Sequence, residues 1–191
     1  METKKKKPKF TILHRSLHWI MGFAMSVLFI TGFLRMYWMN KHRIISVIKS
    51  RLSDSVPADD QLISIATDIR TPMWQWHEIF AHVMILAFII RMIYMILRGV
   101  RFPNPFKTHS PLKDRIKSLT YILFYVLVAV NILTGIYLKW SEAGAWKPSA
   151  ETIHKLALYW FPVIILVHFT GIIMGELTSE KGVTSKMIGG D

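Results

Sequence analysis

Four long apolar stretches constrain this chain more than any other feature of its sequence. They lie at about residues 17–39, 73–97, 119–139 and 153–175, and each consists mostly of apolar side chains. Each has about 20 residues or more, the length that an α-helix needs to cross roughly 30 Å of hydrocarbon. The expected fold is therefore all-α, an integral membrane bundle of four transmembrane helices.

The length of 191 residues and the lack of a long polar region indicate a single domain, residues 1–191. The first apolar stretch follows a basic tail, as in a signal peptide, but it is too long for that role and lacks a small-residue cleavage site. We expect it to be retained. The chain contains no cysteine. This excludes disulfides, thiolate metal sites, iron–sulfur clusters and covalent haem attachment within the chain, so that any redox centre must use histidine or methionine.

The formal net charge of +12 does not indicate a nucleic-acid partner, because the cations flank the apolar stretches instead of lining a soluble face. The clusters before the first stretch and between the second and third contain Lys4, Lys5, Lys6, Lys7, Lys9, Arg15, Arg98, Arg101, Lys107, Lys113, Arg115 and Lys117. By the positive-inside rule this side is cytoplasmic. The opposite connections contain Asp54, Asp59, Asp60, Asp68, Glu142 and Glu151. Both termini are therefore expected in the cytoplasm.

Two connections carry structural information. Residues 40–71 form a long external connection in which apolar side chains recur at near-helical spacing among cations, which predicts a short interfacial helix. This segment could also dock a partner. Residues 102–111 contain Pro103, Pro105 and Pro111 and are expected to form an extended turn on the cytoplasmic surface.

The histidines carry the functional signal, because an imidazole inside a lipid-crossing helix is costly and marks a functional site by default. His18 opens the first stretch, His77 opens the second, and the fourth contains His154 and His168. The last two are fourteen residues apart, about 21 Å of rise and close to four whole turns. We therefore expect them on one helix face at opposite membrane depths.

Depth sorts these histidines into two pairs once both termini are placed inside. The first helix runs outward and the next helices alternate in direction, so His18 and His168 fall at the cytoplasmic side. His77 and His154 fall at the external side. Each pair comes from two different helices, as in the cofactor sites of helix bundles. The pattern predicts two bis-imidazole haem sites, one in each leaflet.

Other roles for these histidines compete with this prediction. A histidine near a helix end can be an interfacial or hydrogen-bonded residue. A non-haem metal is a rival, although zinc and iron sites in bundles use three or four close ligands. His14 lies one turn before His18 and is an alternative ligand. His82 is about 140° around the helix from His77, so it faces elsewhere and could be a proton carrier or a satisfied buried histidine.

The sequence resembles the superfamily of di-haem membrane cytochromes b, which includes bacterial cytochrome b561, the b-type cytochrome subunit of nickel–iron hydrogenases and the gamma subunit of formate dehydrogenase. The resemblance covers nearly the whole chain. It rests on Leu17-His18-Trp19, Thr31-Gly32, His77, Arg91, Thr134-Gly135, His154 and His168. It implies a four-helix core in the bacterial inner membrane, two non-covalent b haems ligated by the four histidines above, and quinone as a mobile substrate.

Several other residues are expected near the haems. Gly22 and Gly32 lie near the helix face of His18, and Gly171 lies one turn after His168. Small residues let a flat macrocycle approach, although glycine also serves ordinary helix packing.

Arg91 lies on the face of His77, roughly 21 Å deeper and beside the inner haem. It would be the partner of a haem propionate, or else it would snorkel to the cytoplasmic surface. Candidates to line a quinone site near the inner haem are Asn131, Glu176 and the region of Gly171.

These expectations lead to an electron-transfer subunit of a respiratory oxidoreductase complex, working between the quinone pool and an external redox subunit. That subunit would be a dehydrogenase, a hydrogenase or a multihaem cytochrome. The alternative is a stand-alone quinone-linked oxidoreductase of the cytochrome b561 type that takes electrons from a small donor. A haem-free channel, carrier or assembly factor is a third possibility. The long external connection departs from the shortest stand-alone members and favours the subunit.

Overall fold

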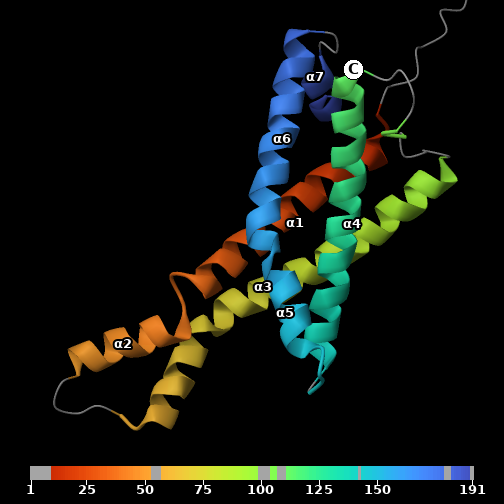
Figure 1. The fold of residues 1–191 in the computed structure, drawn as a ribbon. Coiled ribbons are helices and arrows are strands. Elements are labelled where there is room, and N and C mark those ends of the chain that lie inside the picture. The colour runs from red at the N-terminus through yellow and green to blue at the C-terminus, as the bar shows by residue number, and fades with distance from the viewer. Residues whose placement is uncertain are drawn as a thin grey trace, which may run out of the picture. The chain divides into compact units, whose positions relative to one another are not determined.

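The computed structural model describes residues 10–52, 57–98, 104–106, 111–141, 143–178 and 182–189. Within these ranges the chain forms helices and no strand (Figure 1). The helices are α1 (Ile12–Met36), α2 (Lys41–Arg51), α3 (Asp59–Leu97), α4 (Leu112–Trp140), α5 (Lys147–Lys155), α6 (Ala157–Leu177) and α7 (Val183–Ile188).

The chain divides into two compact units. Unit 1 combines Met1–Ile20 with Ala87–Asp191, and unit 2 is Met21–Leu86. Unit 1 therefore holds the start of α1, the end of α3 and all of α4 to α7. Unit 2 holds the rest of α1, α2 and the first part of α3.

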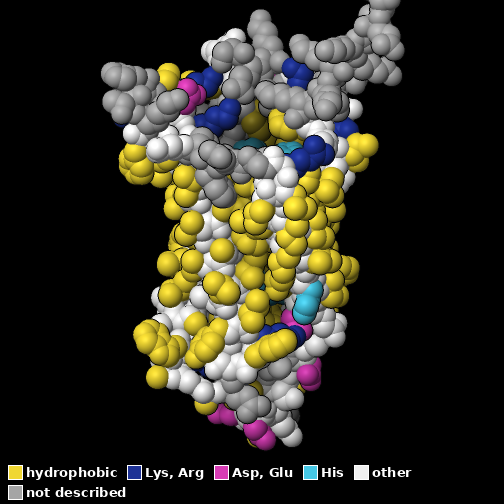
Figure 2. Space-filling model, turned by 90° about the vertical axis from the view of Figure 1, so that its right-hand side faces the viewer, with side chains coloured by type: hydrophobic (Ala, Val, Ile, Leu, Met, Phe, Trp, Pro, Cys, Tyr) yellow, Lys and Arg dark blue, Asp and Glu magenta, His cyan; other side chains and the backbone are white. Residues whose placement is uncertain are grey.

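Four segments are long and apolar enough to cross a membrane: Ile12–Met36, Asp59–Leu97, Leu112–Trp140 and Lys147–Leu177. Between 11% and 28% of their most apolar windows is buried inside the protein. Hydrophobic side chains accordingly cover most of the middle of the surface seen in Figure 2. An apolar surface of this extent requires a hydrocarbon surrounding, because water would drive it to aggregate. The predicted all-α membrane fold is confirmed.

The second membrane helix begins earlier than the sequence predicted. The prediction placed its start at residue 73, whereas α3 begins at Asp59 and runs without a break to Leu97. The preceding turns bury Leu62, Ala66 and Met73 along one side of the helix. Average hydropathy missed these turns because Asp59, Asp60, Asp68 and Arg70 offset the apolar residues of the segment.

The predicted short helix in the connection is confirmed as α2. The side chain of Asn40 caps its start by accepting a hydrogen bond from the His42 N–H at 3.0 Å. Lys49 pairs with Asp59 at 2.8 Å, which joins the end of α2 to the start of α3. Asp54 and Glu142 lie outside the described residues.

The fourth membrane segment, Lys147–Leu177, contains two helices. It consists of α5 and α6, which meet at Leu156. The Leu156 N–H is shared between the carbonyls of Thr152 and Ile153, and its own carbonyl accepts from Tyr159 three residues on. Trp160 also donates to the Leu156 carbonyl at 3.1 Å, so the backbone is tightened at Leu156 while the i→i−4 bonds persist on both sides. His154 therefore lies at the end of α5 and His168 lies in α6, and their common helix face stays a prediction.

Unit 1 brings several chain segments together at one of its ends. The hydroxyls of Thr11 and Tyr94 are 2.8 Å apart, joining the start of α1 to the end of α3. The Arg15 guanidinium donates to the carbonyl of Ile188 at 3.0 Å, which adds α7. The N-terminal side, the end of the second span and the C-terminal helix thus share an end, as the predicted topology requires. Lys4 to Lys9, Arg101 and Lys107 lie outside the described residues, as does most of the predicted turn 102–111.

Arg91 links three helices inside unit 1. Its side chain is only 6% exposed. Its Nε donates to the hydroxyl of Tyr125 on α4, and its Nη1 donates to the backbone carbonyl of His14 on α1 at 3.4 Å. A buried guanidinium is stable only while its donors are satisfied, so this cluster should contribute measurably to stability.

We expect Tyr125→Phe to destabilise the protein by about 1.5–3 kcal/mol, because it removes an acceptor from a buried charged donor. Denaturant unfolding in detergent micelles, followed by circular dichroism, measures the loss. Tyr159→Phe is the matched control, since this ring is 64% exposed. Equal midpoints for the two variants would show that the Arg91 contact does not stabilise the fold.

Candidate functional site

Two of the predicted site histidines meet within unit 1. His18 extends from α1 and His168 from α6, and their ring centroids are 5.9 Å apart with an interplanar angle of 46°. Two metal–nitrogen bonds of about 2 Å each would place facing imidazole nitrogens about 4 Å apart and ring centroids about 6 Å apart. The pair therefore has a separation at which both imidazoles would bind one metal ion.

Arg91 supplies positive charge next to this pair. Its guanidinium interacts electrostatically with the imidazoles of both His18 and His14. Among the described residues no carboxylate lies within ion-pair distance of it. A buried cation with only neutral partners is costly, so an anionic group from outside the protein would complete this site.

His14 occupies a different environment from His18. Its ring stacks on Phe10 with centroids 5.3 Å apart and lies 6.0 Å from the ring of Tyr94. The structure thus pairs His18, and not His14, with the ring of His168.

His77 lies in unit 2 and is held by α1. Its Nδ1 is 2.8 Å from the hydroxyl of Thr31, and this hydroxyl also lies 2.8 Å from the carbonyl of Val27. The hydroxyl therefore joins the His77 ring to the backbone of α1. The indole of Trp74 stacks on the imidazole at 5.0 Å and 4°.

His154 lies in unit 1 and is held in the same way by α4. Its Nδ1 is 3.1 Å from the carbonyl of Asn131 and 3.2 Å from the hydroxyl of Thr134. The carbonyl requires that Nδ1 carries the proton. The ring edge approaches Gly135 so closely that a Cβ there would be 3.0 Å from His154 Cε1. Because Gly135 has no side chain, there is room for the imidazole of His154 beside α4.

A threonine followed by glycine thus supports each of these two histidines from a neighbouring helix. At His154 the carbonyl of Asn131 requires a proton on Nδ1, so Nε2 is the nitrogen that would bind a metal. At His77 the same arrangement, with the Thr31 hydroxyl as acceptor, would also present Nε2 to a metal. The family resemblance rests in part on Thr31-Gly32 and Thr134-Gly135, but it assigned the threonines no role. The Thr-Gly pair occurs in both helices that contact these histidines. This repetition in the sequence could have indicated that the threonines contact the imidazoles.

The remaining predicted residues have simpler surroundings. His82 is exposed, and its Nδ1 donates to the carbonyl of Glu78 at 2.7 Å within its own helix. A Cβ added at Gly22 or at Gly171 would meet no protein atom within 4 Å. Gly32 is half-buried in α1.

The two polar candidates for a quinone site have structural roles. Asn131 donates its side-chain amide to the carbonyl of His154 at 3.0 Å. Glu176 accepts from the backbone N–H groups of Gly182 and Thr184, both at 2.7 Å, and so joins α6 to the start of α7. Both side chains are thus already engaged.

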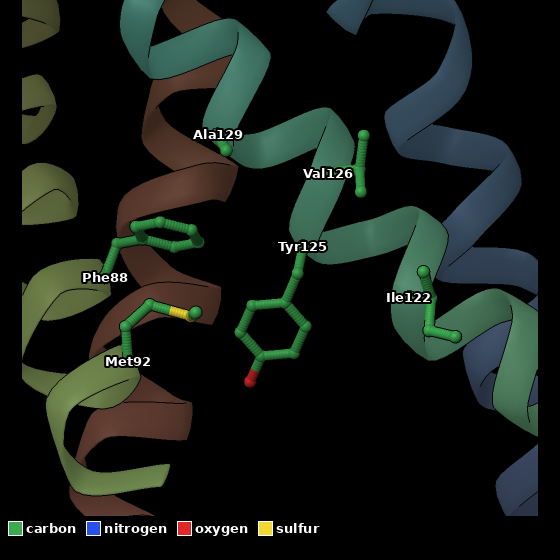
Figure 3. A pocket seen from close by; sticks show the side chains of 6 residues that line it. All are labelled: Phe88, Met92, Ile122, Tyr125, Val126 and Ala129. Carbon is green, nitrogen blue, oxygen red and sulfur yellow. The ribbon is translucent and has the colours of Figure 1, made fainter. Parts of the chain in front are cut away.

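An apolar groove of about 300 Å³ lies between α3 and α4. Figure 3 shows Phe88 and Met92 of α3 on one side and four residues of α4 on the other. The α4 residues are Ile122, Tyr125, Val126 and Ala129. The only polar side-chain group among these six residues is the Tyr125 hydroxyl, which accepts from Arg91.

Among the described residues, no three side chains of the metal-binding types converge. Two imidazoles suffice for a haem, because the porphyrin fills the other four positions of the iron. An imidazole pair at this separation, on helices with lipid-compatible surfaces, defines a membrane protein of the b-type cytochrome class.

The comparison with known families agrees. The family model for prokaryotic cytochrome b561 matches residues 9–190, and the chain belongs to this family. It is a bacterial membrane cytochrome that binds b-type haem and transfers electrons. No curated protein and no solved structure matches the chain.

Proposed function

We propose that this cytochrome binds two b haems and passes electrons between the quinone pool and a redox partner on the external face of the inner membrane. His18 and His168 would ligate the inner haem, and His77 and His154 the outer one. The observation that carries the proposal is the 5.9 Å separation of the His18 and His168 rings. Each bound haem would take up and release one electron at its iron.

The inner site fits this role in its charge as well as its geometry. Neither ring of the His18 and His168 pair has a hydrogen-bond partner among the described residues, so both remain available for a metal. Arg91 would balance a haem propionate. Snorkelling does not account for this arginine, because the guanidinium is buried and bonded to Tyr125 and to the His14 carbonyl.

The outer histidines would be tuned by the groups behind them. Hydrogen bonding at Nδ1 fixes the ring orientation and makes Nε2 a more basic ligand. A more basic ligand favours ferric over ferrous iron and thereby lowers the reduction potential. The Nδ1 of His154 lies near two acceptors, the Asn131 carbonyl and the Thr134 hydroxyl, and that of His77 lies near the Thr31 hydroxyl.

We expect the four ligand variants to sort into two pairs. His18→Ala and His168→Ala should remove or convert one haem, and His77→Ala and His154→Ala the other. The physical reason is that an axial ligand about 2 Å from the iron cannot be replaced by a residue in the other leaflet. Potentiometric titration with haem extraction measures both haem number and identity.

His82→Ala is the control and should keep both haems, because its ring bonds to a carbonyl of its own helix. The pairing would be wrong if His18→Ala and His77→Ala abolished the same component. Loss of the inner haem in His14→Ala, with His18→Ala unaffected, would overturn the ligand assignment.

Thr31→Val should raise the potential of the outer haem and lower its haem affinity roughly 10- to 100-fold, the usual effect of losing a hydrogen bond behind a ligand. Thr134→Val should act in the same direction but more weakly, because the Asn131 carbonyl still accepts from His154. Redox titration and haem transfer to an acceptor apoprotein provide the measurements. Thr178→Val is the control, since its hydroxyl bonds to Met174 in its own helix. Unchanged potentials in both variants would exclude this tuning.

The quinone would react beside the inner haem. Of the three candidates from the sequence, Gly171 keeps an open Cβ position, whereas Asn131 and Glu176 are engaged in structural hydrogen bonds. The cationic end of unit 1 supports placing this side in the cytoplasm, since Arg15, Arg98 and Lys186 belong to the segments gathered there.

α2 supports a partner on the opposite face. None of its residues is buried, and Val47 is 54% exposed among cations. An exposed helix with apolar and basic side chains suits a protein partner or the headgroup region.

Replacing residues 41–48 by a glycine-serine linker of equal length should release the partner in copurification and leave both haem spectra intact. This replacement spares Lys49, which pairs with Asp59, and all of α3. Ser46→Ala is the control on the same helix. Retention of the partner would exclude α2 as its docking site, and loss of haem would make α2 a structural cover.

A further inference from the structure

A second cluster of arginine side chains lies in unit 2. A pocket of about 270 Å³ is formed where the end of α1 meets the first part of α3. Its lining consists of Arg35, Thr67, Arg70, Thr71, Met73 and Trp74. Two of these residues are cationic and none is acidic, so the lining favours an anion.

Arg70 has an unsatisfied donor at this pocket. Its Nε is buried and has no hydrogen-bond partner among the residues that the structure describes. A buried guanidinium N–H without an acceptor costs free energy. The acceptors that suit a guanidinium best are the oxygens of a carboxylate or phosphate, which can bind its planar fork at two points.

Arg35 occupies a defined position at the same pocket. Its guanidinium carbon lies 4.3 Å from the centroid of the Trp74 ring, a cation–π distance. The same indole stacks on the imidazole of His77 at 5.0 Å. Trp74 is therefore in contact with both the cationic pocket and the proposed outer haem ligand.

Helix geometry also places Arg35 and Arg70 near His77, the proposed outer haem ligand. Arg70 precedes His77 by seven residues, which is about two turns, so the two residues share a face of α3. Arg35 follows Thr31 by one turn on α1, and Thr31 holds the His77 ring. Both cations thus lie one to two turns from the contact between Thr31 and His77.

We propose that Arg35 and Arg70 bind a carboxylate, the propionate arm of the haem ligated by His77. This inference rests on the proposed function, because it requires a haem at that histidine. The same anionic oxygen chemistry could come from the phosphate of a lipid headgroup.

Arg70→Gln and Arg35→Gln test the proposal in the full-length, haem-loaded protein. A nearby positive charge favours the reduced haem, and each change removes such a charge. The reduction potential of the haem that His77→Ala abolishes should therefore fall. A tenfold change in its redox equilibrium, about 59 mV for one electron, is expected for the double variant. The haem ligated by His18 and His168 should keep its potential. The haem ligated by His77 should transfer faster to an acceptor apoprotein.

Two controls separate the local effect from net charge and from packing. Arg43→Gln removes an exposed cation from α2 and should leave both potentials unchanged. Arg70→Lys keeps the charge but not the planar fork, so its potential should lie between those of the wild type and Arg70→Gln.

Phosphorus analysis after delipidation, with and without added anionic lipid vesicles, identifies the lipid alternative. Unchanged potentials together with less bound phospholipid in the glutamine variants would overturn the proposal in favour of a lipid headgroup. Unchanged potentials and unchanged lipid would overturn it as well. If His77→Ala itself removes no haem, the proposed function fails first, so the two failures are distinguishable.

Discussion

The hydrocarbon layer offers no water to a polar group, and the rest of this structure depends on that constraint. Backbone amides satisfy one another inside long helices, and the apolar side chains of these helices face outward. What remains inside is a small number of polar side chains, and Arg91 and Thr31 contact neighbouring helices. These few polar contacts therefore define both the packing of the helices and the site.

The histidines differ in whether their rings are hydrogen-bonded to the protein. His77 and His154 are anchored at Nδ1 by Thr31 and by the Asn131 and Thr134 pair. The rings of His18 and His168 instead lie close together, with centroids 5.9 Å apart. A ring anchored from behind has its orientation set before any metal arrives, whereas two facing rings need a ligand between them. If two haems bind as proposed, the protein prepares their sites by different means.

The arginines follow the same rule. Arg91 is buried with neutral partners, and Arg70 has a buried donor that lacks a partner in the described part of the chain. Both lie at seven-residue multiples from His77 along α3, on one helix face. Arg70 and Arg91 thus lie before and after His77 on α3. Two cations in these positions would suit a cofactor that carries its own carboxylates. They would also raise the reduction potentials, opposing the effect of the basic histidine ligands.

The sequence by itself determined the four membrane segments, the short helix α2 and the candidate histidines. These follow from hydropathy, periodicity and the cost of a polar residue in lipid, which are properties of the local chain. The sequence analysis did not predict the turns of α3 before Met73. These turns bury only one side of the helix, and their mean hydropathy is low. The sequence analysis also missed the tightening at Leu156, since a shared backbone hydrogen bond leaves no mark on side-chain spacing. Only the tertiary structure decided that His18 and not His14 meets His168, that Thr31 and Thr134 hold the other rings, and that Arg35 and Arg70 share a pocket. Those choices depend on which helix faces pack together, and contacts between distant segments are not encoded in any one segment.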